Sequence, residues 1–210
     1  MRSRSAPPTS MSAPSAEERR HLVEQILASV DPRLAPGLRE AVARPGPSPL
    51  PGSSQTVVLA GHRSAGKSRL LPMVARMLAR PGLDLDAHLE RLHGRPLRRW
   101  VAEAPQEFRA AERRALQGLP AGGLVAVGGG FLSHHPDALT GLFTLVVPIC
   151  FDTYRERLLT DRTRPRLRAD MSLEEELSAV FHEREVLHAR VPTVALEDFL
   201  RGCLAPEVPL

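Results

Sequence analysis

One stretch of the chain combines glycines, a lysine and a hydroxyl residue at a spacing that suits the phosphates of a nucleotide. An apolar run at residues 56–60 leads into Gly61-His-Arg-Ser-Ala-Gly-Lys-Ser68, of the form G-x-x-x-x-G-K-S, and a helical stretch follows. Glycines let the backbone curl around phosphate, and the N–H groups at a helix N-terminus face the anion. The sequence therefore predicts an ATP site made by Gly61, Ser64, Ala65, Gly66, Lys67 and Ser68.

Lys67 is distinguished by composition as well as by position. Of the 28 lysines and arginines in the chain, it is the only lysine. An ammonium group is a compact point charge that reaches the β- and γ-phosphates, whereas a guanidinium is wider and planar. The hydroxyl of Ser68 can ligate Mg²⁺ beside it. We therefore expect Lys67 to be catalytic and Ser68 to be a metal ligand.

Two carboxylates lie beyond the motif, and the second of them, Asp86, follows Lys67 by nineteen residues. Asp84-Leu-Asp86 ends the second expected strand, and strand alternation puts both side chains on one side of it. Open α/β sheets bind ligands at the carboxyl ends of their strands. We expect the two acids to serve a metal and a substrate hydroxyl.

Two further patterns fit an anionic substrate. Phe108-Arg-Ala-Ala-Glu112 places Arg109 and Glu112 one helical turn apart, so that the guanidinium can be held for a carboxylate, although such pairs are ordinarily solvated ion pairs. The run Gly128-Gly-Gly130 follows an apolar strand and permits close backbone approach to a ligand, although a plain turn accounts for it equally well.

The elements that position these residues alternate between strands and helices. Strands are expected at residues 56–60, 83–85, 124–127, 142–147 and 191–196, with a helix after each of the first four. This alternation is typical of βαβ units around a parallel sheet. Asp152 is expected to cap a helix over 153–159, and Ser172 with Glu175 to form the capping box of a helix that ends near Ala189. Between them, residues 160–171 are polar and Arg-rich, which predicts a loop over a site.

The first 54 residues differ from the rest. Residues 1–14 are rich in Ser, Pro and Ala, Ser15 and Glu18 form a capping-box pattern before an amphipathic run, and residues 45–54 are dense in Pro, Gly and Ser. We expect residues 1–54 to be a flexible extension with one or two short helices and a linker, and residues 55–210 to be the functional domain. A chain without residues 1–50 is accordingly expected to fold.

Composition excludes several classes of protein. The chain has 210 residues, 42% of them hydrophobic, and its pI of about 10.0 permits binding to anions. Basic residues are scattered and aromatics make up only 4%, so nucleic acid is not expected as a partner. No apolar run is long enough to cross a bilayer, and Cys150 and Cys203 lack the spacing of a metal site. We expect a cytoplasmic monomer.

These motifs, in this order, resemble the shikimate kinase family across residues 56–196. The family pattern is a phosphate-binding loop, a D-x-D nineteen residues past its lysine, F-R-x-x-E, G-G-G, an R-P-L-L lid motif and an arginine before L-Y. The lid matches Arg164-Pro-Arg166-Leu167, and Arg184 precedes Leu187-His188. Departures are Arg166 for leucine, His188 for tyrosine, Arg69 for a small hydroxyl residue, and Trp100-Val101 for an aliphatic residue followed by phenylalanine.

The resemblance implies a P-loop kinase fold, a three-layer α/β/α domain with a central five-stranded parallel sheet and a lid loop. It implies ATP- and Mg²⁺-dependent phosphorylation of the 3-hydroxyl of shikimate, in chorismate and aromatic amino-acid biosynthesis. The implied catalytic residues are Lys67, Asp86 and Arg164; Arg157 and Arg164 join the ATP site; Ser68 and Asp84 hold the metal; and Asp86, Arg109, Gly128, Gly129, Gly130 and Arg184 bind shikimate.

Two other interpretations remain open at this stage. Another small-metabolite kinase of the same fold, such as a gluconate kinase, shares the phosphate loop but need not keep two arginines for a carboxylate. A shikimate-kinase-like sensor joined to a DNA-binding domain is the second, but residues 1–50 offer no convincing helix-turn-helix.

Overall fold

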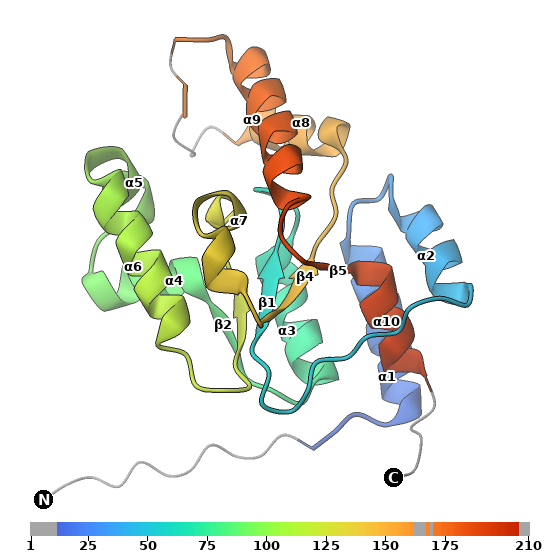
Figure 1. The fold of residues 1–210 in the computed structure, drawn as a ribbon. Helices are drawn as coiled ribbons and strands as arrows, with labels where there is room; N and C mark the ends of the chain where they lie inside the picture. Colours follow the sequence, from blue (N-terminus) through green and yellow to red (C-terminus); the bar gives the residue numbers. More distant parts are fainter. Residues whose placement is uncertain (1–11, 162–166, 169, 206–210) are drawn as a thin grey trace, which may run out of the picture.

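The computed structural model describes residues 12–161, 167–168 and 170–205, and its centre is a five-stranded parallel sheet (Figure 1). The strand order is β2-β3-β1-β4-β5, so β1 lies in the middle, between β3 and β4. The strands are β1 Val57–Ala60, β2 Gly82–Asp84, β3 Leu124–Ala126, β4 Phe143–Val146 and β5 Val194–Ala195.

Helices cover both faces of this sheet, which makes three layers. On one side lie α1 Ala16–Ser29, α2 Ala35–Ala43, α3 Lys67–Met77 and α10 Leu196–Leu204. On the other lie α4 Leu85–His93, α5 Leu97–Glu103, α6 Pro105–Gln117 and α7 Phe131–His134, the last followed by a 3-10 turn at Pro136–Leu139. The helices α8 Phe151–Thr160 and α9 Leu173–His188 stand beyond the carboxyl ends of the strands, at the top of Figure 1. The expected three-layer fold is confirmed.

Side-chain alternation along the central strand explains the two layers of core. Val57 and Leu59 pack into the cluster on the α1, α3 and α10 side, whereas Val58 and Ala60 pack into the cluster on the α4 and α6 side. All four are fully buried. A strand buried on both faces is typical of a parallel sheet covered by helices. None of the helices in the described ranges is long and apolar enough to span a membrane.

The cap of α8 differs from the sequence prediction. The helix begins at Phe151, so Asp152 lies inside its first turn and is not its N-cap. The carboxylate of Asp31 instead accepts hydrogen bonds from the Cys150 backbone N–H and the Thr153 hydroxyl, both at 2.8 Å. Burial alone would raise the pKa of Asp31, but these hydrogen bonds outweigh it and lower the pKa. The capping box of Ser172 and Glu175 on α9 forms as predicted.

The helices before residue 54 are part of the core. Leu22, Val23, Ile26 and Leu27 of α1 are buried in the same cluster as the β1 residues Val57 and Leu59. A bidentate ion pair joins Glu18 of α1 to Arg76 of α3, with nitrogen–oxygen distances of 2.5 and 2.6 Å. The described part of the segment is therefore not a flexible appendage, because its apolar face covers one side of the sheet.

The proline-rich segment after α2 has no regular secondary structure, as expected, but arginines hold it in place. Arg201 of α10 donates to the carbonyl oxygens of Arg44 and Pro47, and Arg80 donates to those of Gly52 and Gln55 at 2.7 Å. These bonds fix the path by which the chain enters β1.

We predict that the core role of α1 can be measured at Ile26, which is fully buried. Ile26→Ala leaves a cavity, so the free energy of unfolding should fall by about 2 to 5 kcal/mol in urea denaturation. Gln25→Ala, at the exposed neighbouring position, should change it by less than about 0.5 kcal/mol. Equal stability of both variants would mean that α1 is dispensable, and that removal of residues 1–50 is tolerated.

Candidate active site

The loop between β1 and α3 has the form of an anion cradle. Gly66 precedes α3 in the left-handed region, with φ of 96°, and no side chain caps the first N–H groups of the helix, which have no partner within it. The Lys67 ammonium folds back over the loop and donates to the carbonyl oxygens of Gly61, at 3.0 Å, and His62, at 2.7 Å. A cavity of about 310 Å³ lies over this loop. Its walls include Ser64, Gly66, Lys67 and Ser68.

Asp84 and Ser68 bring two oxygen donors together at the edge of this cavity. The Ser68 hydroxyl donates to one carboxylate oxygen of Asp84 at 2.5 Å, and the other carboxylate oxygen accepts from the backbone N–H of Ala87 at 3.1 Å. Asp84 is therefore both the last residue of β2 and the N-cap of α4.

The placement of Asp86 on strand β2 was wrong. Because Asp84 caps α4, the strand ends there and Asp86 lies in the first turn of the helix. Its carboxylate nevertheless reaches the same end of the sheet, where it lines the cavity over the phosphate loop. Both acids therefore line this cavity because Asp86 lies in the first turn of α4, and not because the two residues alternate along a strand.

A second cavity, of about 350 Å³, opens beside the first and is rich in arginine. Arg109 of α6 and Arg184 of α9 approach the same point: a methyl group placed on Gly130 would lie 3.2 Å from the Arg184 guanidinium and 3.4 Å from that of Arg109. The cavity is also lined by Asp86, Leu97, Val101, Phe108, Glu112, Gly128, Gly129 and Leu167.

Glu112 holds one of these two arginines, Arg109. Its carboxylate is 1% exposed and accepts a hydrogen bond from Arg109 at 2.6 Å. Burial raises the pKa of Glu112 to about 7, against the opposing effect of Arg109. Burial also lowers the pKa of Arg184 to about 10, and one of its guanidinium nitrogens has no hydrogen-bond partner among the described residues. The cavity therefore presents positive charge that an anion can satisfy.

The two cavities share part of their walls. Arg63, Asp86, Gly128 and Gly129 line both of them. A ligand phosphate over the loop and a ligand in the arginine cavity would consequently meet at Asp86. This juxtaposition suits transfer of a group between two bound molecules, because both can be held at adjoining positions.

Other expected site residues fall in different places. Arg157 of α8 donates to the carbonyl oxygen of Ser64 at 2.6 Å, so it supports the phosphate loop. Trp100 is buried in the core against Phe108, and its neighbour Val101 lines the arginine cavity instead. Arg164 and Arg166 lie outside the described residues.

Three residues of the site were missed in the sequence. Arg63 lines both cavities, and Glu90 and Arg98 line the one with the arginines. Two of these residues could have been found from the sequence. Arg63 lies inside the phosphate-binding motif, and Glu90 lies one helical turn after Asp86. Arg98 had no such signal, because only the packing of α5 brings it there.

Comparisons with known proteins concern most of this domain. The sequence model of the shikimate kinase family matches residues 63–199. A shikimate kinase of Desulforudis audaxviator is 32% identical over 124 residues, which are 56% of this chain and 65% of that protein. A shikimate kinase of Chlorobium luteolum is 31% identical over 142 residues, 61% of this chain and 70% of that protein.

Solved structures show the same architecture. The shikimate kinase of Acinetobacter baumannii in complex with shikimate has a TM-score of 0.58 at 24% identity, covering 67% of this chain and 82% of that chain. The shikimate kinase of Aquifex aeolicus has a TM-score of 0.56 at 20% identity, covering 69% and 87%. At these identities the likeness shows a shared fold and nothing further.

We predict that Gly129→Ala disrupts the shared wall. Its methyl group would come within 2.5 Å of the Arg63 backbone nitrogen, a contact that no side-chain rotation relieves. We expect the free energy of unfolding to fall by about 1 to 3 kcal/mol in urea denaturation. The control Gly37→Ala in α2, where nothing lies within 4 Å of the new methyl, should be neutral or stabilising by up to about 1 kcal/mol. Wild-type stability of Gly129→Ala would contradict the close contact.

Proposed function

Because the chain belongs to the shikimate kinase family, we propose that it transfers the γ-phosphoryl group of ATP to the 3-hydroxyl of shikimate. The observation that supports this most strongly is the wall shared by the phosphate-loop cavity and the arginine cavity. The former suits the phosphates of ATP and the latter a small acid. In the transfer, the hydroxyl oxygen forms a bond to the γ-phosphorus while the bond from that phosphorus to the β–γ bridging oxygen breaks.

The phosphate loop holds the donor in this proposal. Backbone N–H groups at the start of α3 bind phosphate oxygens, and the Lys67 ammonium moves from the carbonyl oxygens of Gly61 and His62 to the β- and γ-phosphates. Arg157 keeps the loop in shape through Ser64 and borders the nucleotide. Arg164 is proposed to meet the transferred phosphoryl group from the lid.

The oxygen donors of Ser68 and Asp84 fit a magnesium ion. They lie 2.5 Å apart at the edge of the phosphate cavity, and Mg²⁺ prefers oxygen ligands and few of them from protein. Ser68 would hold the ion directly and Asp84 would support it through water. Bound there, the ion would neutralise charge on the phosphates.

The arginine cavity orients the acceptor. Arg109 and Arg184 bind the carboxylate of shikimate with the backbone at Gly128, Gly129 and Gly130 close beside the ring, and Glu112 fixes the Arg109 guanidinium. Asp86 lies where the two cavities meet, so it binds the reacting hydroxyl and receives its proton. We also propose that the protein is a monomer. We further propose that it acts in the cytoplasm.

The proposal predicts shikimate-dependent release of ADP in the presence of ATP and Mg²⁺. Lys67→Arg keeps the charge but presents a wider planar group, so turnover should fall by roughly 10² to 10³-fold, or about 3 to 4 kcal/mol of transition-state stabilisation. A coupled assay of ADP release measures this, with circular dichroism to verify folding.

Arg69→Lys is the matched control: it makes the reverse exchange at an exposed residue of the same cavity wall, keeps the charge, and should retain most of the activity. Binding of ATP without formation of shikimate 3-phosphate by the wild-type protein would favour a sensor. Near-normal turnover of Lys67→Arg would mean that the loop does not position the phosphoryl group.

The arginines should separate binding of the two substrates. Arg109→Ala and Arg184→Ala each remove a charge-assisted hydrogen bond, worth about 1.5 to 3 kcal/mol, so the KM for shikimate should rise by roughly 10- to 150-fold while the KM for ATP changes little. The control Arg113→Ala, on the same helix, removes an arginine that pairs with Asp137 at the surface and should alter neither constant. Equal damage to both constants would show that these arginines do not hold the acceptor.

A further inference from the structure

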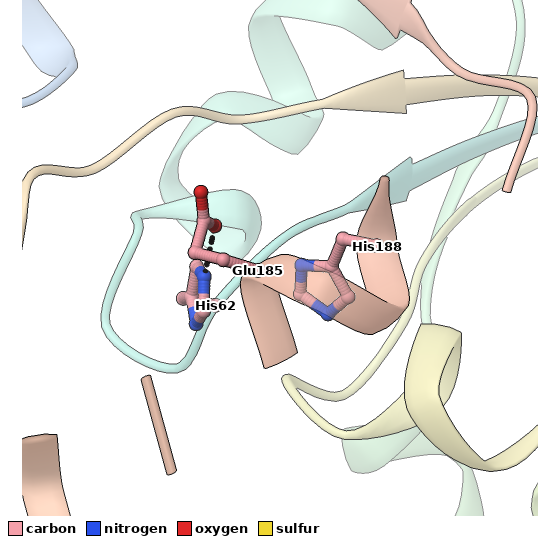
Figure 2. A group of neighbouring side chains, drawn as sticks. All are labelled: His62, Glu185 and His188. Carbon is pink, nitrogen blue, oxygen red and sulfur yellow. Dashed lines mark hydrogen bonds and ion pairs between the residues drawn. The ribbon is translucent and has the colours of Figure 1, made fainter. Parts of the chain in front are cut away.

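A cluster of two histidines and a glutamate lies beside the phosphate loop, apart from both cavities of the proposed reaction. Figure 2 shows His62, from the loop after β1, next to Glu185 and His188, from the last turns of α9. One ligand atom from each side chain can be chosen so that all three atoms lie within 4.8 Å of one another. His62 and Glu185 are 123 residues apart in the sequence, so the cluster joins the loop after β1 to α9.

Aromatic packing fixes the His62 ring in this position. The ring stacks on Phe181 at a centroid distance of 4.2 Å and meets the edge of Tyr154 at 5.7 Å. The His188 ring lies 4.8 Å from it. The His62 imidazole is therefore held by aromatic neighbours that are not ligands, and both histidines are buried, with the His62 side chain 5% and His188 8% exposed. A metal ion would find this part of the site already ordered.

Hydrogen bonds satisfy only some of the polar atoms in the cluster. His62 Nε2 lies 2.6 Å from Glu185 Oε1, but the buried His62 Nδ1 and His188 Nε2 have no hydrogen-bond partner within the described chain. Buried polar atoms ordinarily have partners, so these two point to a ligand. An imidazole nitrogen that carries no proton offers a lone pair to a metal ion.

The cluster opens on a cavity of about 490 Å³ that could supply further ligands. His62, Glu185 and His188 line one side of it, and Glu197 and Asp198 of α10 line another. Lys67 and Arg184 are the nearby positive charges, and both act against a cation. Lys67 donates to loop carbonyl oxygens and Arg184 faces Gly130, whereas three carboxylates border the cavity.

We propose that His62, Glu185 and His188 form a site for a divalent transition-metal ion, with Zn²⁺ as the best match. A set of three protein ligands, two imidazole nitrogens and one carboxylate, is typical of zinc sites that keep a fourth position for water or another ligand. Mg²⁺ is a poor match because it prefers oxygen ligands in an octahedral arrangement. The Glu185 side chain is 57% exposed, which leaves it room to adjust to a Zn²⁺ ion, whose nitrogen and oxygen ligands lie at about 2.0 to 2.2 Å.

Such an ion would clamp α9 to the phosphate loop. His62 accepts a hydrogen bond from Lys67 through its carbonyl oxygen, and Glu185 directly follows Arg184 in the chain. The ion would thus stabilise the folded protein by linking the loop after β1 to the helix that carries Arg184. This site and its effect on stability do not depend on the proposed reaction.

The experiment uses the full chain after chelator treatment, with Zn²⁺ titrated against a chromophoric competitor and with Co²⁺ as a visible probe of the coordination geometry. His188→Tyr and Glu185→Gln each remove one ligand, so Zn²⁺ affinity should fall at least about tenfold. Because Glu185 is exposed, its variant keeps the test valid even if His188→Tyr folds poorly. Excess Zn²⁺ should raise the Tm of the wild type and not that of these variants.

Matched controls lie on the same helix. His182→Tyr and Glu183→Gln repeat the same substitutions at exposed positions outside the cluster, and both should bind one Zn²⁺ with wild-type affinity. Failure of the wild type to bind Zn²⁺ would overturn the proposal. So would equal affinity in the wild type, the two ligand variants and the two controls, since the ion would then be bound elsewhere.

Discussion

The contact between the phosphate loop and the glycine turn after β3 is the constraint on which the site depends. The backbone of Arg63 lies so close to Gly129 that a single methyl group there would come within 2.5 Å of its nitrogen. The strands behind these two loops are neighbours in the sheet, because β1 pairs with β3 in parallel register from Val57 with Leu124 to Leu59 with Ala126. Parallel pairing makes both loops leave the sheet at the same edge. The two cavities share a wall for this reason.

Charge in the arginine cavity is incompletely balanced within the protein. Four arginines line it, and the acidic residues there are three, one of them deeply buried: Arg63, Arg98, Arg109 and Arg184, with Asp86, Glu90 and the buried Glu112. Burial disfavours the charged form of Arg184 and lowers its pKa to about 10, yet the guanidinium stays charged at neutral pH. A buried cation with an unfilled donor is costly until an anion arrives. Preorganised positive charge of this kind suits a small carboxylic acid and positions it for reaction.

The N-terminal helices support this site from a distance. Glu18 of α1 pairs with Arg76 on α3, the helix whose N-terminus forms the phosphate cradle. Asp31, after α1, binds the start of α8, and Arg157 on α8 holds the carbonyl oxygen of Ser64 in the loop. The family match covers residues 63–199, so Glu18 and Asp31 lie outside the matched residues. They connect the added segment to the loop through two helices.

The sequence by itself determined the fold class and the local chemistry, because both depend on short-range patterns. Alternating strands and helices predicted the parallel sheet, the G-x-x-x-x-G-K-S motif indicated an anion cradle, and the Ser172 capping box predicted the start of α9. Only tertiary structure decided what depends on distant partners. Asp31 binds the start of α8, where Asp152 was expected to be the cap, Asp86 lies on a helix and not on a strand, and α1 belongs to the core. Such contacts are selected by packing across the whole domain, and no local pattern records them.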